Sequence, residues 1–538
     1  MPSRLRDAAN RLSRIPWIPI AVWAVLYLPR PLRIGFYGDD WMAIVQPAYL
    51  TPPFSPARFH HFFGLDTPYA ARPVAGWIEF VISSVCGTSP FAHQLIATFI
   101  CLAVALSFRS WTTAQFTDVP RRGALAADFA AAFWLASPWM LGITGWVTCT
   151  PHLLTQLCLT ELGRRFLTEQ SFSRRRLTAY AAALAASGLI YEILYFQIFL
   201  IIGFYILCQR PRFPLRQKAL PVFIACLAGQ IFSVIANRSI AAANPVGVGM
   251  KHFRSDWHRP LLLSLRTLPE LLTATLGANS TLWWNAVTVL ATVATLMLFV
   301  GLFRRDHRAH AARAAGLLLL GAAATVLSAA TLSVAGFNFQ ASALETRTMF
   351  GPSWGMAIAF YALASMVLLW DAPLFRWLLS AIGAVMLTVM GQAHLENIAE
   401  FSYAWQRQKE VLANIPAGEL LRLPRGAAIF YTGPSYFHRI PIFAAGFDIG
   451  PAVASRLPLL DAQPFDRRMA FYSATDIYHW SWNGVILKLD FPGFWSAEYP
   501  VKRLYIWNWP SRTIEEAHAG FRWNPGESWQ ATVAPPAP

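Results

Sequence analysis

Charged residues are scarce in this chain. They make up 13% of its 538 residues, whereas a soluble globular domain carries about 25%. Hydrophobic residues reach 55%, and the mean hydropathy is +0.40. The composition therefore excludes an ordinary soluble globular protein and predicts a protein that crosses a membrane several times.

Cysteine is sparse as well. The cysteines lie in or beside apolar stretches, form no CxxC pair and have no histidine at ligand spacing. The six are Cys86, Cys101, Cys149, Cys158, Cys208 and Cys226. This pattern excludes a disulfide framework and a zinc site, and it predicts that these side chains are buried as small hydrophobic groups.

Acidic residues are fewer than basic ones, 28 against 44, which gives a net charge of +16. A basic protein can bind nucleic acid, but here the lysines and arginines gather in short runs between apolar segments. That distribution is typical of loops retained on the cytoplasmic side of a membrane. We therefore expect the membrane as a partner and no nucleic acid.

The first apolar run lacks a signal-peptide cleavage site. Residues 1–14 carry four arginines and precede the apolar residues 15–28, but Arg30-Pro31-Leu32-Arg33 follows where small residues would be needed. This order predicts an uncleaved first span with a cytoplasmic N-terminus, so that the next loop lies outside.

Hydropathy and the basic loops together predict about eleven transmembrane helices with the C-terminus outside. The predicted spans cover residues 15–28, 91–108, 124–143, 146–162, 219–240, 282–303, 314–335, 354–370 and 378–390, with two more in residues 177–207. Residues 177–207 are too many for one span and few for two spans, and we divide this stretch at Glu192. Residues 74–86 are too few to span and predict an interfacial or partly inserted helix.

Hydropathy falls after residue 392. Strand-like pieces such as residues 427–431 and 485–489 follow in a mixed polar sequence that is long enough to bury its own core. The predicted fold class is an all-α polytopic membrane protein with a C-terminal extracytoplasmic α/β or β-rich domain. We place the transmembrane domain at 1–392, its first outer loop at about 35–72, and the C-terminal domain at 393–538.

Two adjacent carboxylates open the first outer loop, in Tyr37-Gly38-Asp39-Asp40-Trp41. Neighbouring Asp side chains repel one another, so they persist where donors, cations or a metal offset their charge, or where one stays protonated. The alternative is a solvated turn, since Gly-Asp is a common turn dipeptide.

The predicted topology gathers more charged residues on the outer face. They are Arg72, Glu192, Lys251, Arg254, Arg259, Glu345 and Arg347. Carboxylates beside cations at a membrane surface can deprotonate a hydroxyl and bind an anionic lipid headgroup. Ordinary loops are also charged, and that simpler explanation is strongest for Lys251, Arg254 and Arg259. It is weaker for Asp39, Glu192 and Arg347, which lie at span boundaries where charge is costly.

The order of three short motifs resembles the N-terminal signature of the GT-C superfamily of membrane glycosyltransferases. The motifs are Asp39-Asp40-Trp41, Arg72-Pro73-Val74 and residues 87–95, GTSPFAHQL. Similar families are the protein O-mannosyltransferases and the lipid A aminoarabinose transferases, which take sugars from polyprenyl-phosphate donors. The resemblance covers roughly residues 16–110, with weaker support from Glu192 and from Glu345-Thr346-Arg347.

The resemblance implies an inverting transfer in which an acidic residue of the first outer loop acts as base or holds a metal. Carried over, that role falls on Asp39 or Asp40, and we favour Asp39. Arg347 is the first choice for the donor phosphate, because a guanidinium can hold two phosphate oxygens, with Arg72, Lys251 and Arg254 as alternatives. Glu192, Glu345 and Trp41 are further expected site residues.

A divalent cation, Mg or Mn, would suit paired Asp oxygens at Asp39 and Asp40. No full ligand set is visible, and the residues available to complete one are His60, His61 and Asp66. Surface histidines in an aromatic stretch more often pack against their neighbours, so we give this metal site low weight.

The expected partners are a polyprenyl-phosphate-linked sugar donor and an acceptor on a glycan, lipid or protein. The expected location is the bacterial inner membrane, with the C-terminal domain in the periplasm. The rival functions are a lipid-linked glycan polymerase or ligase, which would not need the Asp pair, and a non-catalytic lipid- or glycan-binding protein. A transporter would need ionisable residues deep within spans, and beyond Glu161 and Glu192 the sequence offers almost none.

Overall fold

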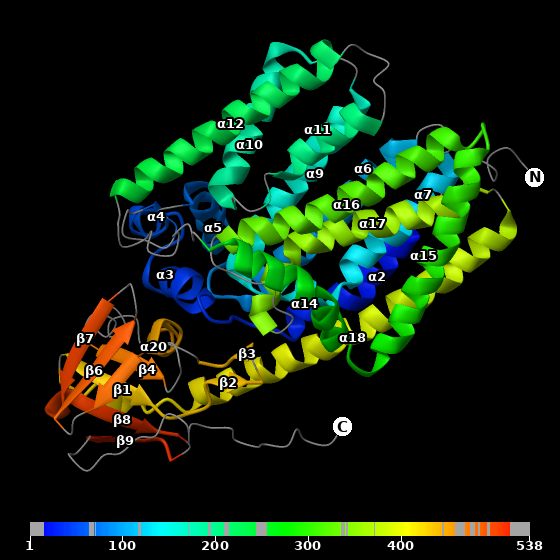
Figure 1. Ribbon diagram of the computed structural model, residues 1–538. Coiled ribbons are helices and arrows are strands. Elements are labelled where there is room, and N and C mark those ends of the chain that lie inside the picture. Colours follow the sequence, from blue (N-terminus) through cyan, green and yellow to red (C-terminus); the bar gives the residue numbers. More distant parts are fainter. Residues whose placement is uncertain are drawn as a thin grey trace, which may run out of the picture.

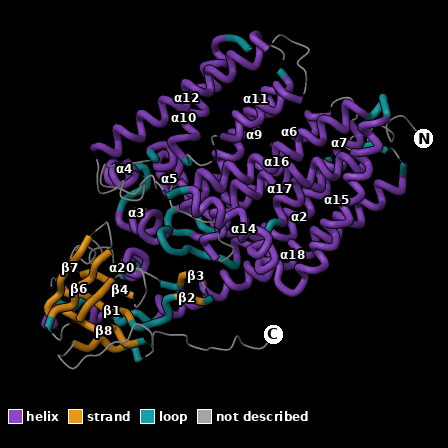
Figure 2. The backbone as a smooth tube through the Cα atoms, in the orientation of Figure 1, coloured by secondary structure: helices purple, strands orange, loops and turns teal. Residues whose placement is uncertain are grey.

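The structure is a computed structural model. It describes residues 15–63, 69, 72–116, 120–169, 172–191, 194, 196–208, 215–243, 256–334, 339, 343–370, 372–424, 426–438, 440–443, 446–457, 469–473, 479–482, 485–491, 495–509 and 511–516. A bundle of long helices forms most of the molecule, and the strands gather at one end of it (Figures 1 and 2).

The helical bundle confirms the prediction of an integral membrane protein. Its main helices are α2 (Trp17–Tyr27), α6 (Pro90–Thr113), α7 (Pro120–Ala136), α9 (Thr150–Thr168), α10 (Arg174–Ile190), α11 (Phe196–Cys208), α12 (Leu215–Ala243), α14 (His258–Leu276), α15 (Ser280–Phe303), α16 (Arg308–Val334), α17 (Phe350–Val367) and α18 (Pro373–Ala413). Within the described residues, six helical segments are long and apolar enough to cross a membrane, or seven if a bent pair counts as one span. The expected number of about eleven stays a prediction.

Two features fit these helices to a bilayer. Large apolar side chains such as Phe223, Phe232 and Phe299 are exposed on α12 and α15, as expected of surfaces that face lipid. Inside the bundle, α16 and α17 approach closely, because a Cβ on Gly321 would lie only 2.6 Å from the carbonyl oxygen of Gly355, and the reverse contact is equally short. Small residues commonly permit such close helix packing in membranes.

The long helices differ from the predicted spans in three places. The expected span 124–143 is broken after Ala136 and bends by 55° into Pro138–Thr144, because a proline cannot continue the hydrogen-bond ladder of the helix. The next helix starts at Thr150, later than predicted. Part of the stretch between the predicted spans 219–240 and 282–303 is the helix α14, whose leucines recur at three- and four-residue spacing.

Ionisable groups also enter the helices more than the sequence suggested. Arg109 of α6 forms an ion pair with Asp128 of α7, and both side chains are largely buried. The pair neutralises both charges and ties two helices together, which is a structural use of charge within the bundle.

The first outer loop is built from short helices. It contains a π-helical turn (Trp41–Val45), α3 (Gln46–Leu50) and α4 (Pro56–Phe63), and it leads to α5 (Pro73–Cys86). The predicted short helix is confirmed as α5, which has 14 residues. At 1.5 Å per residue it is about 21 Å long, short of the ~30 Å hydrocarbon core. Arg58 is fully buried and donates hydrogen bonds to the carbonyl oxygens of Ala48 and Ser83, so it joins α3 and α4 to α5.

The predicted C-terminal strands are present. β1 (Ala427–Tyr431) lies in a four-stranded sheet of order β4-β1-β8-β9, between the parallel strands β4 (Met469–Ser473) and β8 (Leu504–Asn508). The sheet ends at β9 (Thr513–Glu516). All five residues of β1 are buried, as expected of a central parallel strand.

Two smaller sheets and one helix complete this region. β5 (His479–Trp482), β6 (Ile486–Phe491) and β7 (Trp495–Pro500) form an antiparallel sheet, and β2 (Tyr436–Phe437) pairs with β3 (Ile440–Pro441). The helix is α20 (Gly446–Ala454). An α/β C-terminal region is therefore confirmed.

The C-terminal region lies directly against the first outer loop. α18 runs without a break across residue 392, where we expected the domain boundary, and leads into the strands (Figure 1). The ring of Trp41 lies 6.2 Å from Trp405 of α18 and 6.0 Å from Phe443. The turn that carries the Asp pair is thus held between the membrane helices and the C-terminal region.

Candidate active site

The Asp pair sits on a tight turn. Gly38 has a φ of 51°, a left-handed conformation that glycine adopts without steric cost. The turn directs the carboxylate of Asp40 back into the protein, where the side chain is fully buried. Asp40 Oδ2 accepts hydrogen bonds from the backbone N–H groups of Tyr37 (3.0 Å) and Val147 (3.3 Å), and Oδ1 accepts one from Thr148 (2.9 Å).

These bonds give Asp40 a structural task. Burial raises the pKa of the Asp40 carboxyl to about 7, the three backbone donors lower it, and the charge of Asp39 raises it. A pKa near 7 suits a general base, but a base must also reach the proton that it takes. Asp40 has no exposed surface, and its oxygens hold the 37–40 turn to residues 147–148. Geometry therefore argues against Asp40 as the base.

Asp39 is placed differently. Its side chain is partly exposed, whereas that of Asp40 is fully buried. Its backbone carbonyl accepts a hydrogen bond from Ala43 N at 2.7 Å, which fixes it at the start of the helical turn. Of the two neighbouring carboxylates, Asp39 is the one that a substrate can approach.

Arg347 is brought to the same place by the loop between α16 and α17. It lies in a 3₁₀ turn, Ala343–Met349, in which the Thr346 hydroxyl accepts a hydrogen bond from Gly142 N at 2.9 Å. The Arg347 guanidinium lies 4.5 Å from the centre of the Trp146 ring. Trp146 directly precedes the two residues that bind Asp40, so the cation and the carboxylates approach the same short segment.

Arg72 reaches this segment from another direction. It precedes α5, and its guanidinium lies 5.5 Å from the centre of the Tyr191 ring. The Tyr191 ring in turn lies 3.9 Å from the ring of His152, in the first turn of α9. Arg72 is therefore linked to the first turn of α9 through two aromatic rings.

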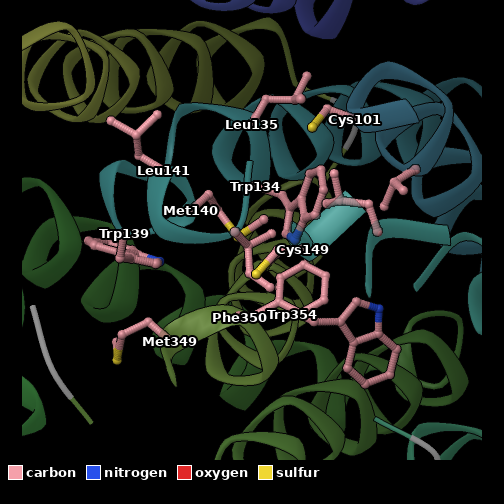
Figure 3. Close-up of a cluster of buried hydrophobic side chains, with 14 of the residues drawn as sticks. Cys101, Trp134, Leu135, Trp139, Met140, Leu141, Cys149, Met349, Phe350 and Trp354 are labelled. Atoms are coloured by element: carbon pink, nitrogen blue, oxygen red, sulfur yellow. The ribbon is translucent and has the colours of Figure 1, made fainter. Parts of the chain in front are cut away.

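The Cys149 thiol experiences all four charges. Burial raises its pKa to about 12, while Arg347 and Arg72 lower it and Asp40 and Asp39 raise it. Asp39, Asp40, Arg72 and Arg347 thus all act electrostatically on this buried residue. Beneath it lies a core of large apolar side chains that includes Phe350 and Trp354 (Figure 3). Acidic and basic groups of the site thus act next to a core of buried apolar side chains.

Most of the remaining predicted site residues lie outside the part of the chain that the structure describes. Lys251, Arg254 and Glu192 lie outside the described residues, as do Asp66 and the side chain of Glu345. Trp41 is buried against Trp405 and Phe443, so its observed contacts are with protein.

The residues do not fit a divalent-cation site. No group of three His, Cys, Asp or Glu residues that could hold a metal occurs in the described part of the chain. Asp40 already accepts three backbone hydrogen bonds, while Mg and similar cations require several oxygen ligands. We therefore derive no step through a metal.

Two parts of the site escaped the sequence analysis. Residues 146–149 were assigned to the start of a span, although Pro151 at the beginning of α9 is a helix-start signal. Glu79 of α5 was overlooked. It is the one acidic residue in an otherwise apolar helix, and such residues are usually functional.

The placement of Asp40 leads to a stability prediction. Asp40→Asn replaces one carboxylate oxygen by an NH₂ group that cannot accept a backbone hydrogen bond, so we expect a loss of about 1–3 kcal/mol of stability. Thermal unfolding of the purified protein in detergent measures this loss. Asp39→Asn serves as the control and should unfold at the wild-type temperature. An Asp40→Asn protein that is as stable as the wild type would contradict the structural role.

Comparison with known proteins gives a weak similarity. Two solved structures of ArnT from Cupriavidus metallidurans resemble the chain. The form bound to undecaprenyl phosphate has a TM-score of 0.42 and 12% identity, over 79% of this chain and 83% of that one. The apo form has a TM-score of 0.35 and 11% identity, over 87% and 86%. No protein-family model matches the chain, and no curated protein matches it.

Because both TM-scores lie below 0.5, the function has to be argued from the residues of the chain itself.

Proposed function

We propose that the protein is a membrane glycosyltransferase that moves a sugar from a polyprenyl-phosphate donor to a hydroxyl group of a cell-envelope glycan, lipid or protein. The observation that carries the proposal is that Arg347 lies over Trp146, directly before the two residues that hold Asp40 and, with it, the partly exposed Asp39. The order of the N-terminal motifs, which resembles that of GT-C enzymes, supports it. We place the protein in the bacterial inner membrane with this site facing the periplasm.

The acidic and the basic residues of the site have different tasks in the reaction. The Asp39 carboxylate takes the proton of the acceptor hydroxyl, whose oxygen attacks the anomeric carbon of the donor sugar. The bond from that carbon to the phosphate oxygen breaks, and the configuration at the carbon inverts. The lipid phosphate leaves with increased negative charge, which Arg347 and Arg72 offset.

The other residues of the site act by position. Asp40 holds the 37–40 turn to residues 147–148, so it fixes Asp39 relative to Trp146. The Arg347 guanidinium is held over the face of the Trp146 ring. Charge pairs that are held in place before substrate arrives need no reorganisation during the reaction, which is the main source of electrostatic catalysis.

A transfer assay tests the proposal. Membranes that contain the protein, or an empty-vector control, are incubated with labelled polyprenyl-phosphate monosaccharides and an envelope extract as acceptor. We expect label to leave the donor lipid only where the protein is present, and excess undecaprenyl phosphate to slow the transfer. Transfer of preassembled oligosaccharides alone would favour the polymerase or ligase, and no transfer of either would contradict an enzyme.

A further inference from the structure

Glu79 is a fully buried carboxyl group beside the site. It lies on α5, two turns beyond Arg72, and its side chain has no exposed surface. Neither carboxyl oxygen has a hydrogen-bond partner among the residues that the structure describes. Burial raises the pKa of Glu79 well above its usual range, and the nearby charge of Asp40 raises it further. Burial without a hydrogen-bond donor disfavours the carboxylate form, and a carboxylic acid can both donate and accept a hydrogen bond.

Tyr69 presents a second such group. It is 93% buried, and its hydroxyl also lacks a partner within the described part of the chain. Its Cβ lies 3.2 Å from the position that a Cβ on Gly76 would occupy, so Tyr69 packs against the face of α5 that carries Glu79 one turn later. Burial raises the pKa of the Tyr69 hydroxyl, and Glu79, Asp40 and Asp39 shift it in the same direction. Both groups thus adjoin the Asp pair.

Among the buried polar groups that lack a partner in the described part of the chain, Glu79 is the one carboxyl group, and both of its oxygens are without a partner. The equally buried Asp40 accepts three hydrogen bonds a short distance away, whereas Glu79 and Tyr69 accept none from the described residues. Buried polar groups nearly always have partners, and an exception at a site commonly marks a place that a ligand fills. Two neutral O–H groups and a carbonyl oxygen match sugar hydroxyls, which are themselves donors and acceptors.

We propose that Glu79 and Tyr69 form the subsite that holds hydroxyl groups of the transferred donor sugar. The proposal rests on the proposed glycosyltransferase function. It adds a binding place for the sugar of the donor, beside the arginines that bind the phosphate. Glu79 lies seven residues after Arg72, which is about 10 Å along the helix axis. A donor whose phosphate lies at Arg72 therefore extends its sugar along α5 toward Glu79.

Donor binding without transfer tests this subsite. The probes are undecaprenyl phosphate alone and the same lipid linked to mannose, glucose or aminoarabinose, bound to the purified protein in detergent. The wild type should bind one sugar-linked lipid more tightly than the bare lipid. Glu79→Met should weaken binding of that conjugate about tenfold, the loss of one or two hydrogen bonds, and leave the bare lipid unchanged. Glu79→Gln, which keeps a donor and an acceptor, should stay within about threefold of the wild type.

Stability separates this function from a structural role. A buried carboxyl without a partner costs folding free energy, so Glu79→Met should unfold at or above the wild-type temperature while losing sugar affinity. Glu396→Met makes the same chemical change at an exposed position of α18 and should alter neither property. Tyr69→Phe should resemble Glu79→Met in its binding.

Three results would overturn the subsite. The first is a wild-type preference for a conjugate that Glu79→Met retains. The second is loss of both conjugate and bare-lipid binding in Glu79→Met together with a lower unfolding temperature, which would indicate a structural role. The third is a wild type that binds none of these lipids, which would overturn the proposed function and the subsite with it.

Discussion

Asp39→Asn is expected to reduce sugar transfer by about 10²–10⁴-fold, the range that a positioned general base contributes. The amide side chain of Asn is not basic enough to take the acceptor proton. The size and polarity of that side chain nevertheless match those of the Asp carboxylate. Because Asp39 is partly exposed, the substitution should not disturb the packing of the turn. The variant is compared with the wild type at matched expression in the membrane transfer assay.

The lipid affinity and the unfolding temperature of Asp39→Asn show whether the variant has lost catalysis alone. Loss of catalysis alone leaves the affinity for undecaprenyl phosphate and the unfolding temperature unchanged. Asp40→Asn provides the contrast, since its transfer should fall in proportion to the loss of folded protein. If Asp40→Asn keeps its stability and loses transfer while Asp39→Asn transfers normally, the base is Asp40. Normal transfer by both variants would contradict a catalytic role for the pair.

Arg347→Ala is expected to weaken binding of undecaprenyl phosphate by about 10–100-fold and to lower transfer at least as much. A hydrogen bond to a charged group contributes about 1.5–3 kcal/mol, and the guanidinium offers two such bonds to one phosphate. Arg347→Lys keeps the charge but loses the bidentate geometry, so it should recover only part of the affinity. Equilibrium binding of the bare lipid to the purified variants measures both effects.

Arg407 of α18 supplies a matched control. Its guanidinium lies over the ring of Tyr403 at 5.0 Å, much as Arg347 lies over Trp146, and it pairs with Glu410. Arg407→Ala should therefore lose an aromatic contact without changing lipid binding. If Arg407→Ala and Arg347→Ala weaken the lipid equally, the effect of Arg347 is not specific to a phosphate site.

The sequence predicted that the parts of the site share one face of the membrane, and the resemblance favoured Asp39 and Arg347, but it did not show which residues touch. Basic runs orient the spans, so Asp39, Arg72 and Arg347 were predicted to lie outside together. Their roles within that set depend on contacts between segments far apart in the chain. Asp40 and Val147 are 107 residues apart, and no local pattern predicts that bond.

Glu79 and the 146–149 segment show why the remainder was missed. Hydropathy averages over a window, so a single acid in an apolar helix barely changes the result. The bend after Ala136 and the late start of α9 depend on Pro138 and Pro151, which the span assignment passed over. Local signals existed in both places, and their importance became apparent only from their neighbours.

The sequence by itself determined the membrane environment, the mainly helical bundle, the short helix α5 and the strand β1 within a C-terminal α/β region. Each follows from local physical chemistry: apolar length, proline at helix starts, and β-rich apolar runs between polar turns. Only the tertiary structure decided that Asp40 is a buried tether, that Asp39 is the accessible carboxylate, and that Arg347 lies over Trp146 beside the residues that bind Asp40. Burial and hydrogen-bond partners are properties of neighbours in space, and residues 40, 147 and 347 become neighbours only when the helices pack.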